Sequence, residues 1–78
     1  MGQALFSKIL KANRKKSGKS QWQVAEEAGF DRSYISLLER SMRQPSLETV
    51  VKLSKVLNTK ASRLIEEMES LEETQGTN

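Results

Sequence analysis

The stretch FDRSYISLLERS, residues 30–41, decides the fold, because it combines a marked helix start with an amphipathic pattern. Asp31 can accept hydrogen bonds from the backbone N–H groups of a first helical turn, as an N-cap residue does. A helix is therefore expected to begin at Arg32. Ile35 and Leu38 lie three positions apart and share one face of that helix, which leaves a polar face free to contact a partner.

A second short helix is predicted directly upstream, over about residues 20–28. Ser20 and Gln23 match the capping-box pattern, in which two side chains satisfy backbone groups at the start of a helix. Gly29 opens the turn that follows, since glycine enters the left-handed region without a steric penalty. Two short helices joined by about three residues with a glycine at the front have the spacing of a helix-turn-helix.

Two longer helices are predicted on either side of this pair. Residues 3–17 carry an apolar stripe at helical spacing, and Gly18 ends the helix. Ser46, placed directly after Pro45, can cap a fourth helix that runs to about residue 57. Its buried face is expected to contain Leu47, Val50, Val51, Ser54 and Leu57, widened by Leu53 and Val56.

A fifth helix is predicted from about residue 61, and it has more apolar residues than the end of a small core needs. These residues are Leu64, Ile65, Met68 and Leu71. We expect this stripe to form the interface of a homodimer, since a two-fold axis lets one stripe cover its own copy. The polar segment 72–78 has no periodicity and is expected to be a disordered tail, which leaves a domain over residues 1–71.

The composition excludes several classes of protein. The chain of 78 residues has no cysteine and no histidine, so it lacks disulfides, thiolate nucleophiles, the usual zinc ligands and the commonest general base. We expect no enzymatic activity, no metal or other cofactor and no small-molecule ligand. No apolar run approaches the roughly 18 residues that a membrane helix needs, so we expect a cytoplasmic protein without a membrane partner.

The charge is distributed unevenly along the chain. Residues 1–60 hold twelve Lys or Arg and five Asp or Glu, a net charge of +7, whereas residues 61–78 hold one and five, a net charge of −4. A basic body suits a polyanion such as nucleic acid. Basic surfaces without such a partner are also common, so the charge alone leaves both interpretations open.

Residues 20–40, SQWQVAEEAGFDRSYISLLER, and residues 44–57, QPSLETVVKLSKVL, together with Arg14, resemble the Cro and phage-repressor type of helix-turn-helix domain. The Tyr-Ile-Ser run is also similar to the controller proteins of restriction-modification systems. The resemblance implies an all-α, five-helix, lambda-repressor-like domain whose second and third helices form the helix-turn-helix. It also implies double-stranded DNA as the partner and a bacterial or phage-encoded, nucleoid-associated protein.

The resemblance implies roles for particular residues of this sequence. Four are expected to face base edges in the major groove: Arg32, Ser33, Ser36 and Leu37. Four others are expected to contact DNA phosphates: Gln21, Tyr34, Arg43 and Gln44. Gln21 is also expected to brace Arg32. Arg14 and Glu39 match a pair that forms an inner salt bridge in this family, the alternative being two unrelated surface charges.

Arg32 and Leu37 differ in what they could read. An arginine can form two hydrogen bonds with O6 and N7 of guanine, whereas a leucine can only meet a thymine methyl group. The alternatives without base contact are a solvated Arg32 and a Leu37 that packs under a loop.

Two positions depart from the family pattern. Ser41 stands where the family usually has glycine, so either the loop closes in another way or the chain tolerates strain of about 1 kcal/mol. Trp22 is a large ring where shorter side chains are usual. It could lie against the DNA sugar-phosphate or pack on the first helix.

The function expected from the sequence is a sequence-specific transcriptional regulator, a repressor or dual regulator, that binds a palindromic operator as a homodimer. The alternative is an antitoxin or adaptor that keeps the helix-turn-helix fold and uses its fifth helix to hold another protein.

Overall fold

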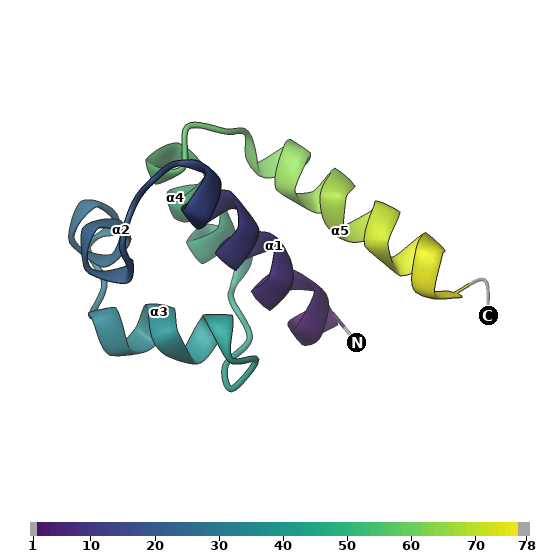
Figure 1. Ribbon diagram of the computed structural model, residues 1–78, viewed down its shortest axis with the longest axis horizontal. Helices are drawn as coiled ribbons and strands as arrows, with labels where there is room; N and C mark the ends of the chain where they lie inside the picture. Colours follow the sequence, from purple (N-terminus) through teal and green to yellow (C-terminus); the bar gives the residue numbers. More distant parts are fainter. Residues whose placement is uncertain (1, 77–78) are drawn as a thin grey trace.

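The computed structural model describes residues 2–76, and the described residues form helices and connecting turns without any strand. The helices are α1 (Gly2–Lys16), α2 (Gln21–Ala28), α3 (Arg32–Glu39), α4 (Leu47–Val56) and α5 (Ala61–Gly76). In Figure 1, α2 and α3 lie side by side at one end of the molecule, and α5 runs along α1 in the opposite direction. The predicted all-α fold with five helices is confirmed. Within residues 2–76, no helix is long and apolar enough to cross a membrane.

All five helices contribute to a single core. Its largest fully buried side chains are Phe6, Leu10, Val24, Ile35, Leu38, Leu53 and Leu64. Full burial of a large apolar side chain contributes about 1.5–3 kcal/mol to the free energy of unfolding, so this cluster holds the helices together. Ile35 and Leu38 both face inward, as their spacing predicts, and they fix which side of α3 remains outside.

The predicted capping residues occupy the starts of α2, α3 and α4, but only two of them cap with their side chains. Ser20 and Gln23 form the predicted capping box, and Ser46 accepts a hydrogen bond from the backbone N–H of Thr49. Asp31 occupies the N-cap position of α3, yet its side chain makes no capping hydrogen bond. The prediction of a side-chain cap by Asp31 is therefore wrong. Its exposed carboxylate stays in water, and its backbone carbonyl still accepts the first helical hydrogen bonds.

Within residues 2–76, each of the helices α1 to α4 ends in the same kind of turn. One residue of the turn adopts the left-handed conformation, with φ of 74° at Gly18, 79° at Gly29, 61° at Ser41 and 59° at Asn58. The next N–H then reaches back to the carbonyl five residues earlier, which is the Schellman pattern. Ser41 thus adopts the conformation that usually belongs to glycine, and its Oγ lies 2.8 Å from the Oγ of Ser7 on α1. Glycine could not form this link between α1 and the end of α3.

Two residues assigned to the buried face of α4 are in fact exposed. Leu47 is 70% exposed and Val51 is 36% exposed. The buried positions of α4 and its C-cap are Thr49, Val50, Leu53, Ser54 and Leu57. Leu47 and Val51 are four residues apart, so they form a stripe next to this face rather than on it. The assignment of these two residues to the core is therefore corrected.

The helix α5 continues through Gly76, whereas the sequence predicts a disordered tail from residue 72. The residues from 72 onward contain glutamate and glutamine, which are good helix formers, and no proline. An existing helix extends through such residues at little cost. The predicted disorder is therefore corrected for residues 72–76. Residues 77–78 of the predicted tail lie outside the described residues.

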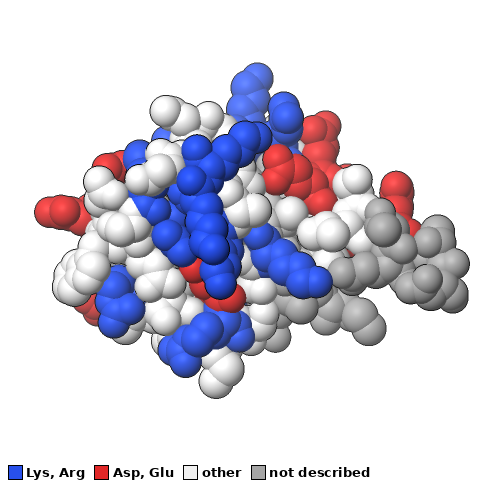
Figure 2. Space-filling view, viewed as in Figure 1, with Lys and Arg blue, Asp and Glu red and all other residues white. Residues whose placement is uncertain are grey.

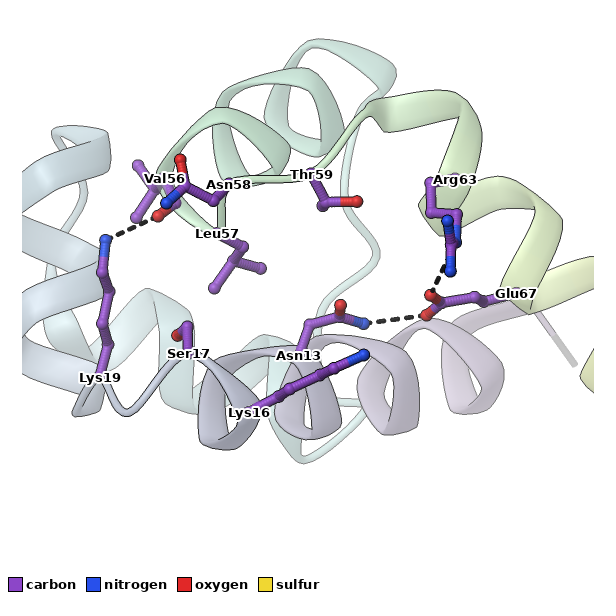
Figure 3. A pocket seen from close by; sticks show the side chains of 10 residues that line it. All are labelled: Asn13, Lys16, Ser17, Lys19, Val56, Leu57, Asn58, Thr59, Arg63 and Glu67. Atoms are coloured by element: carbon purple, nitrogen blue, oxygen red, sulfur yellow. Dashed lines mark hydrogen bonds and ion pairs between the residues drawn. The ribbon is translucent and has the colours of Figure 1, made fainter.

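A polar pocket between α1, the end of α4 and α5 shows how α5 is held against the body (Figure 3). Asn13 donates a hydrogen bond to Oε1 of Glu67 over 2.9 Å, and Arg63 lies 3.7 Å from Oε2 of the same carboxylate. At the other side of the pocket, Lys19 donates to the carbonyl of Val56 over 2.7 Å. These contacts tie α5 to α1, and the α1–α2 turn to the end of α4.

Candidate nucleic-acid interface

The side of α3 that faces away from the core carries the four residues predicted to contact bases. Arg32 and Ser33 are exposed, and Ser36 and Leu37 are half-buried. The side chain of Arg40, one turn further on, donates from Nε to the Oγ of Ser36 over 3.2 Å. This side of α3 therefore presents polar groups to solvent along the length of the helix. Whether these groups contact bases stays a prediction.

Four of the predicted residues form one continuous chain of hydrogen bonds. Arg14 of α1 binds Glu39 of α3 through two nitrogens, with Nε 2.6 Å from Oε2 and Nη2 3.1 Å from Oε1. Nε2 of Gln21 donates to the same Oε1 of Glu39 over 3.0 Å. Oε1 of Gln21 in turn accepts a hydrogen bond from Nη1 of Arg32 over 3.3 Å. This chain of hydrogen bonds begins at Arg14 in α1 and ends at Arg32, the first residue of α3.

The buried pair of Arg14 and Glu39 orients the exposed side chain of Arg32 through Gln21. The side chains of Arg14 and Glu39 are only 13% and 3% exposed, so the pair is held in a fixed, two-pronged geometry. An amide group has one donor side and one acceptor side. Because the nitrogen of Gln21 donates to Glu39, its oxygen is turned toward Arg32. A buried ion pair of this kind fixes geometry more than it adds to stability.

The residues predicted to contact phosphates lie in two places. Gln21 stands at the start of α2, whereas Arg43 and Gln44 are exposed in the loop after α3. Tyr34 is half-buried, and its ring packs on that of Phe30 with centroids 5.1 Å apart. The guanidinium of Arg43 lies 5.8 Å from the centroid of the Tyr34 ring. Tyr34 and Arg43 are therefore neighbours, although they are nine positions apart in the sequence.

The basic and acidic side chains are only partly separated in space. Figure 2 shows Lys and Arg gathered across the middle of the molecule, with Asp and Glu over α5 at the upper right and also at the left end. The exposed cations of α1 are Lys8, Lys11, Lys15 and Lys16, and those of α3 and its flanking turn are Arg32, Arg40 and Arg43. A polyanion that binds along α3 would therefore meet a positive potential.

Two side chains on this surface were not among the site residues predicted from the sequence. Trp22 is 70% exposed, which leaves little of its ring to pack on the first helix. Its ring lies instead 5.8 Å from the guanidinium carbon of Arg32. Arg40 bonds to Ser36, a contact that the four-residue spacing of the two positions on one helix could have indicated.

The residues predicted to form a dimer interface divide into two groups. Leu64 is fully buried in the core of the single chain, so its assignment to the interface is corrected. It is the first large apolar residue of α5, and it lies in the core where the helix packs on α1 and α4. Ile65 is exposed, while Met68 and Leu71 are half-buried and pack against the edge of the core. These three stay a prediction as interface residues.

A helix-turn-helix family model matches residues 10–64, which include α2, α3 and α4. The chain belongs to this helix-turn-helix family. It is 36% identical over 69 residues to the HTH-type transcriptional regulator SinR of Bacillus subtilis (strain 168), a match that covers 87% of this chain and 62% of SinR. The chain thus spans less than two thirds of that relative's length.

Two solved structures resemble the chain over most of its length. The restriction-modification controller protein C.AhdI from Aeromonas hydrophila is 34% identical, with a TM-score of 0.76 over 80% of this chain and 94% of that chain. The controller protein C.Esp1396I, solved as a tetramer in complex with its natural 35 base-pair operator, is 26% identical. Its TM-score is also 0.76, over 87% of this chain and 95% of that chain. The family resemblance predicted from the sequence is confirmed.

Proposed function

We propose that this protein is a transcriptional regulator that binds double-stranded operator DNA with α3 and the start of α2. The observation that carries the proposal is the chain of hydrogen bonds from Arg14 to Arg32. It joins α1, α2 and α3, and it orients an exposed arginine at the first residue of α3. A purely structural bridge would not need to extend to that exposed side chain. Membership of a helix-turn-helix family supports the same assignment.

The proposed contacts divide into base reading and phosphate binding. With α3 in the major groove, Arg32 pairs with a guanine, and Leu37 meets a thymine methyl group. Gln21 and Arg43, at the two ends of the surface, hold the flanking phosphates and set the register of the helix. The acidic residues of α5 lie away from this surface, so they do not oppose the DNA (Figure 2).

We propose further that the protein binds as a homodimer through an apolar patch made by α4 and α5. The patch consists of the exposed Leu47 of α4, the exposed Ile65 of α5 and the half-buried Met68, and it is extended by the exposed Val51, one turn from Leu47 on α4. Leu47, Ile65 and Met68 line one hollow together with Phe6, Gln44, Pro45 and Val50. A second copy related by a two-fold axis would cover the patch with the same residues.

A dimer also contacts enough base pairs to specify a single site. One recognition helix contacts too few base pairs to specify a single site in a genome, whereas two copies read two half-sites. Their centres would lie about 34 Å apart, which is about one turn of DNA, on a palindromic operator. A protein of this kind in a bacterial or phage-infected cell would act in the cytoplasm, at the nucleoid.

The same apolar patch also favours a second candidate function, in which the protein is an antitoxin or adaptor. In that case the patch made by Leu47, Val51, Ile65 and Met68 holds a different protein, and DNA binding is secondary. The two candidates differ in solution, because a regulator that dimerises through the patch is a dimer without any other protein present.

The experiment that tests the proposal is a salt titration of binding to a fluorescent duplex of random sequence. A protein that neutralises several phosphates must lose affinity steeply as the salt concentration rises. We expect the same steep slope for the parent and for Lys60→Ala, which removes an exposed cation directly before α5. No binding at low salt, or an affinity independent of salt, would contradict the proposal.

A further inference from the structure

The indole ring of Trp22 is exposed and does not belong to the core. It is the second residue of α2, it is 70% exposed, and it follows directly after Gln21. Its ring faces Arg32, whose guanidinium carbon lies 5.8 Å from the ring centroid. Trp22 and Arg32 also line one shallow hollow, together with Ala25, Glu26, Phe30 and Asp31. The ring therefore lies beside the arginine that the proposed function assigns to base reading.

Arg32 needs such support because it is exposed and flexible. An arginine side chain loses much rotamer freedom when it is fixed, which opposes binding. Two carboxylates, those of Glu26 and Asp31, line the same hollow and could draw the guanidinium away from the front of α3. Among the described residues, no ion pair joins Arg32 to either of them. The contacts of Arg32 are instead the amide of Gln21 and the ring of Trp22.

These two contacts leave the guanidinium able to bind a base. Gln21 occupies Nη1 of Arg32 with one hydrogen bond. An aromatic ring attracts the cation through its face and consumes none of its five N–H donors. Arg32 therefore keeps further donors free for the O6 and N7 atoms of a guanine, while its orientation is already restricted.

We propose that Trp22 is a positioning residue, which together with Gln21 holds Arg32 in the orientation that reads the operator. The inference rests on the proposed function, since it concerns the same surface. Pre-ordering lowers the cost of binding only where Arg32 makes its specific pair. Loss of the ring should therefore lower the affinity for operator and leave the affinity for random DNA unchanged.

The test compares Trp22→Ala, Trp22→Leu and Trp22→Phe in competition binding between the operator, defined as the site that the parent selects from a random duplex pool, and duplex of random sequence. An exposed cation–π contact corresponds to about a two- to five-fold change in affinity. We expect this loss in the operator-to-random ratio for the alanine and leucine variants, a smaller loss for phenylalanine, and an unchanged salt slope. In the Arg32→Ala background, Trp22→Ala should cause no further loss. An equal loss for both DNAs, or additive losses in the two backgrounds, would overturn the inference.

A second measurement needs no DNA. Trp22 is the only tryptophan of the chain, so its fluorescence reports on its own surroundings. Arg32→Ala should change the emission of the folded protein, and the matched control Arg43→Ala, which removes a cation near Tyr34, should not. Unchanged emission in Arg32→Ala refutes the contact even where the parent binds DNA as proposed. A parent that prefers no operator refutes the proposed function, whatever the fluorescence shows.

Discussion

At the residue scale, Arg32 and Arg43 are both exposed arginines near α3, yet their surroundings differ. Arg32 is held by an amide and by the ring of Trp22 at the start of the helix. Arg43 lies over the ring of Tyr34 in the loop that follows the helix. The proposed function gives sequence reading to the first and phosphate binding to the second, and both roles are predictions.

Arg43→Ala should weaken binding to operator and to random DNA by the same factor. A phosphate contact carries no sequence information, and its loss lowers the slope of log affinity against log salt by about 1. Anisotropy titrations at several salt concentrations measure both quantities. A loss confined to the operator would show that Arg43 reads bases.

Ser41 combines an unfavourable backbone conformation with a hydrogen bond to Ser7. Ser41→Gly should change the free energy of unfolding little, because relief of about 1 kcal/mol of strain offsets a hydrogen bond of similar size. Ser41→Ala also loses the bond but keeps the strain, so it should be about 1 kcal/mol less stable than Ser41→Gly. Urea denaturation compares the two variants. Equal stabilities would show that the left-handed conformation is not retained in solution.

At the element scale, the buried pair of Arg14 and Glu39 joins α1 to the end of α3. Arg14→Met and Glu39→Gln should each lower the free energy of unfolding by about 3–5 kcal/mol, because each leaves an unpaired buried charge. The double variant should recover part of the loss, which a double-mutant cycle in denaturant measures.

The more exposed pair of Arg63 and Glu67 on α5, whose side chains are 64% and 32% exposed, is the control for this cycle. Its coupling should be no more than about 0.5 kcal/mol, as for other exposed pairs four residues apart on a helix. A coupling of that small size between Arg14 and Glu39 would show that the two charges do not stabilise each other.

The sequence predicts the elements and the inner face of α3, because Ile35 and Leu38 permit only one packing direction. It does not predict the buried face of α4, because apolar residues lie on several sides of this helix and tertiary packing decides which of them are buried. Leu47 and Val51 are the ones left exposed. The pairing of Gln21 with Arg32 follows from the family resemblance. The contact between Trp22 and Arg32 depends on how two helices approach in space, which no local pattern contains.

At the scale of the whole molecule, the apolar patch around Leu47 and Ile65 makes dimerisation testable without damage to the core. Both residues are exposed in the single chain, so Leu47→Glu with Ile65→Glu should preserve the helical fold. Carboxylates buried in the proposed dimer interface would lose their hydration, so we expect the double variant to be a monomer. Sedimentation equilibrium and circular dichroism measure the two properties.

Trp22→Glu serves as the control for this variant, because it adds a carboxylate at an exposed apolar residue of α2. It should remain a dimer, like the parent. A double variant that is still a dimer would place the interface elsewhere. A parent that is a monomer would contradict the proposed homodimer.

Selection of bound sites from a random duplex pool tests whether α3 reads a symmetric operator through Arg32. For the parent we predict a palindrome with half-site centres about 34 Å apart. Each half-site should contain one guanine whose enrichment disappears with Arg32→Ala, since the pair is worth about 1–3 kcal/mol of discrimination. An unenriched pool, an asymmetric site, or the same guanine selected by Arg32→Ala would contradict the account.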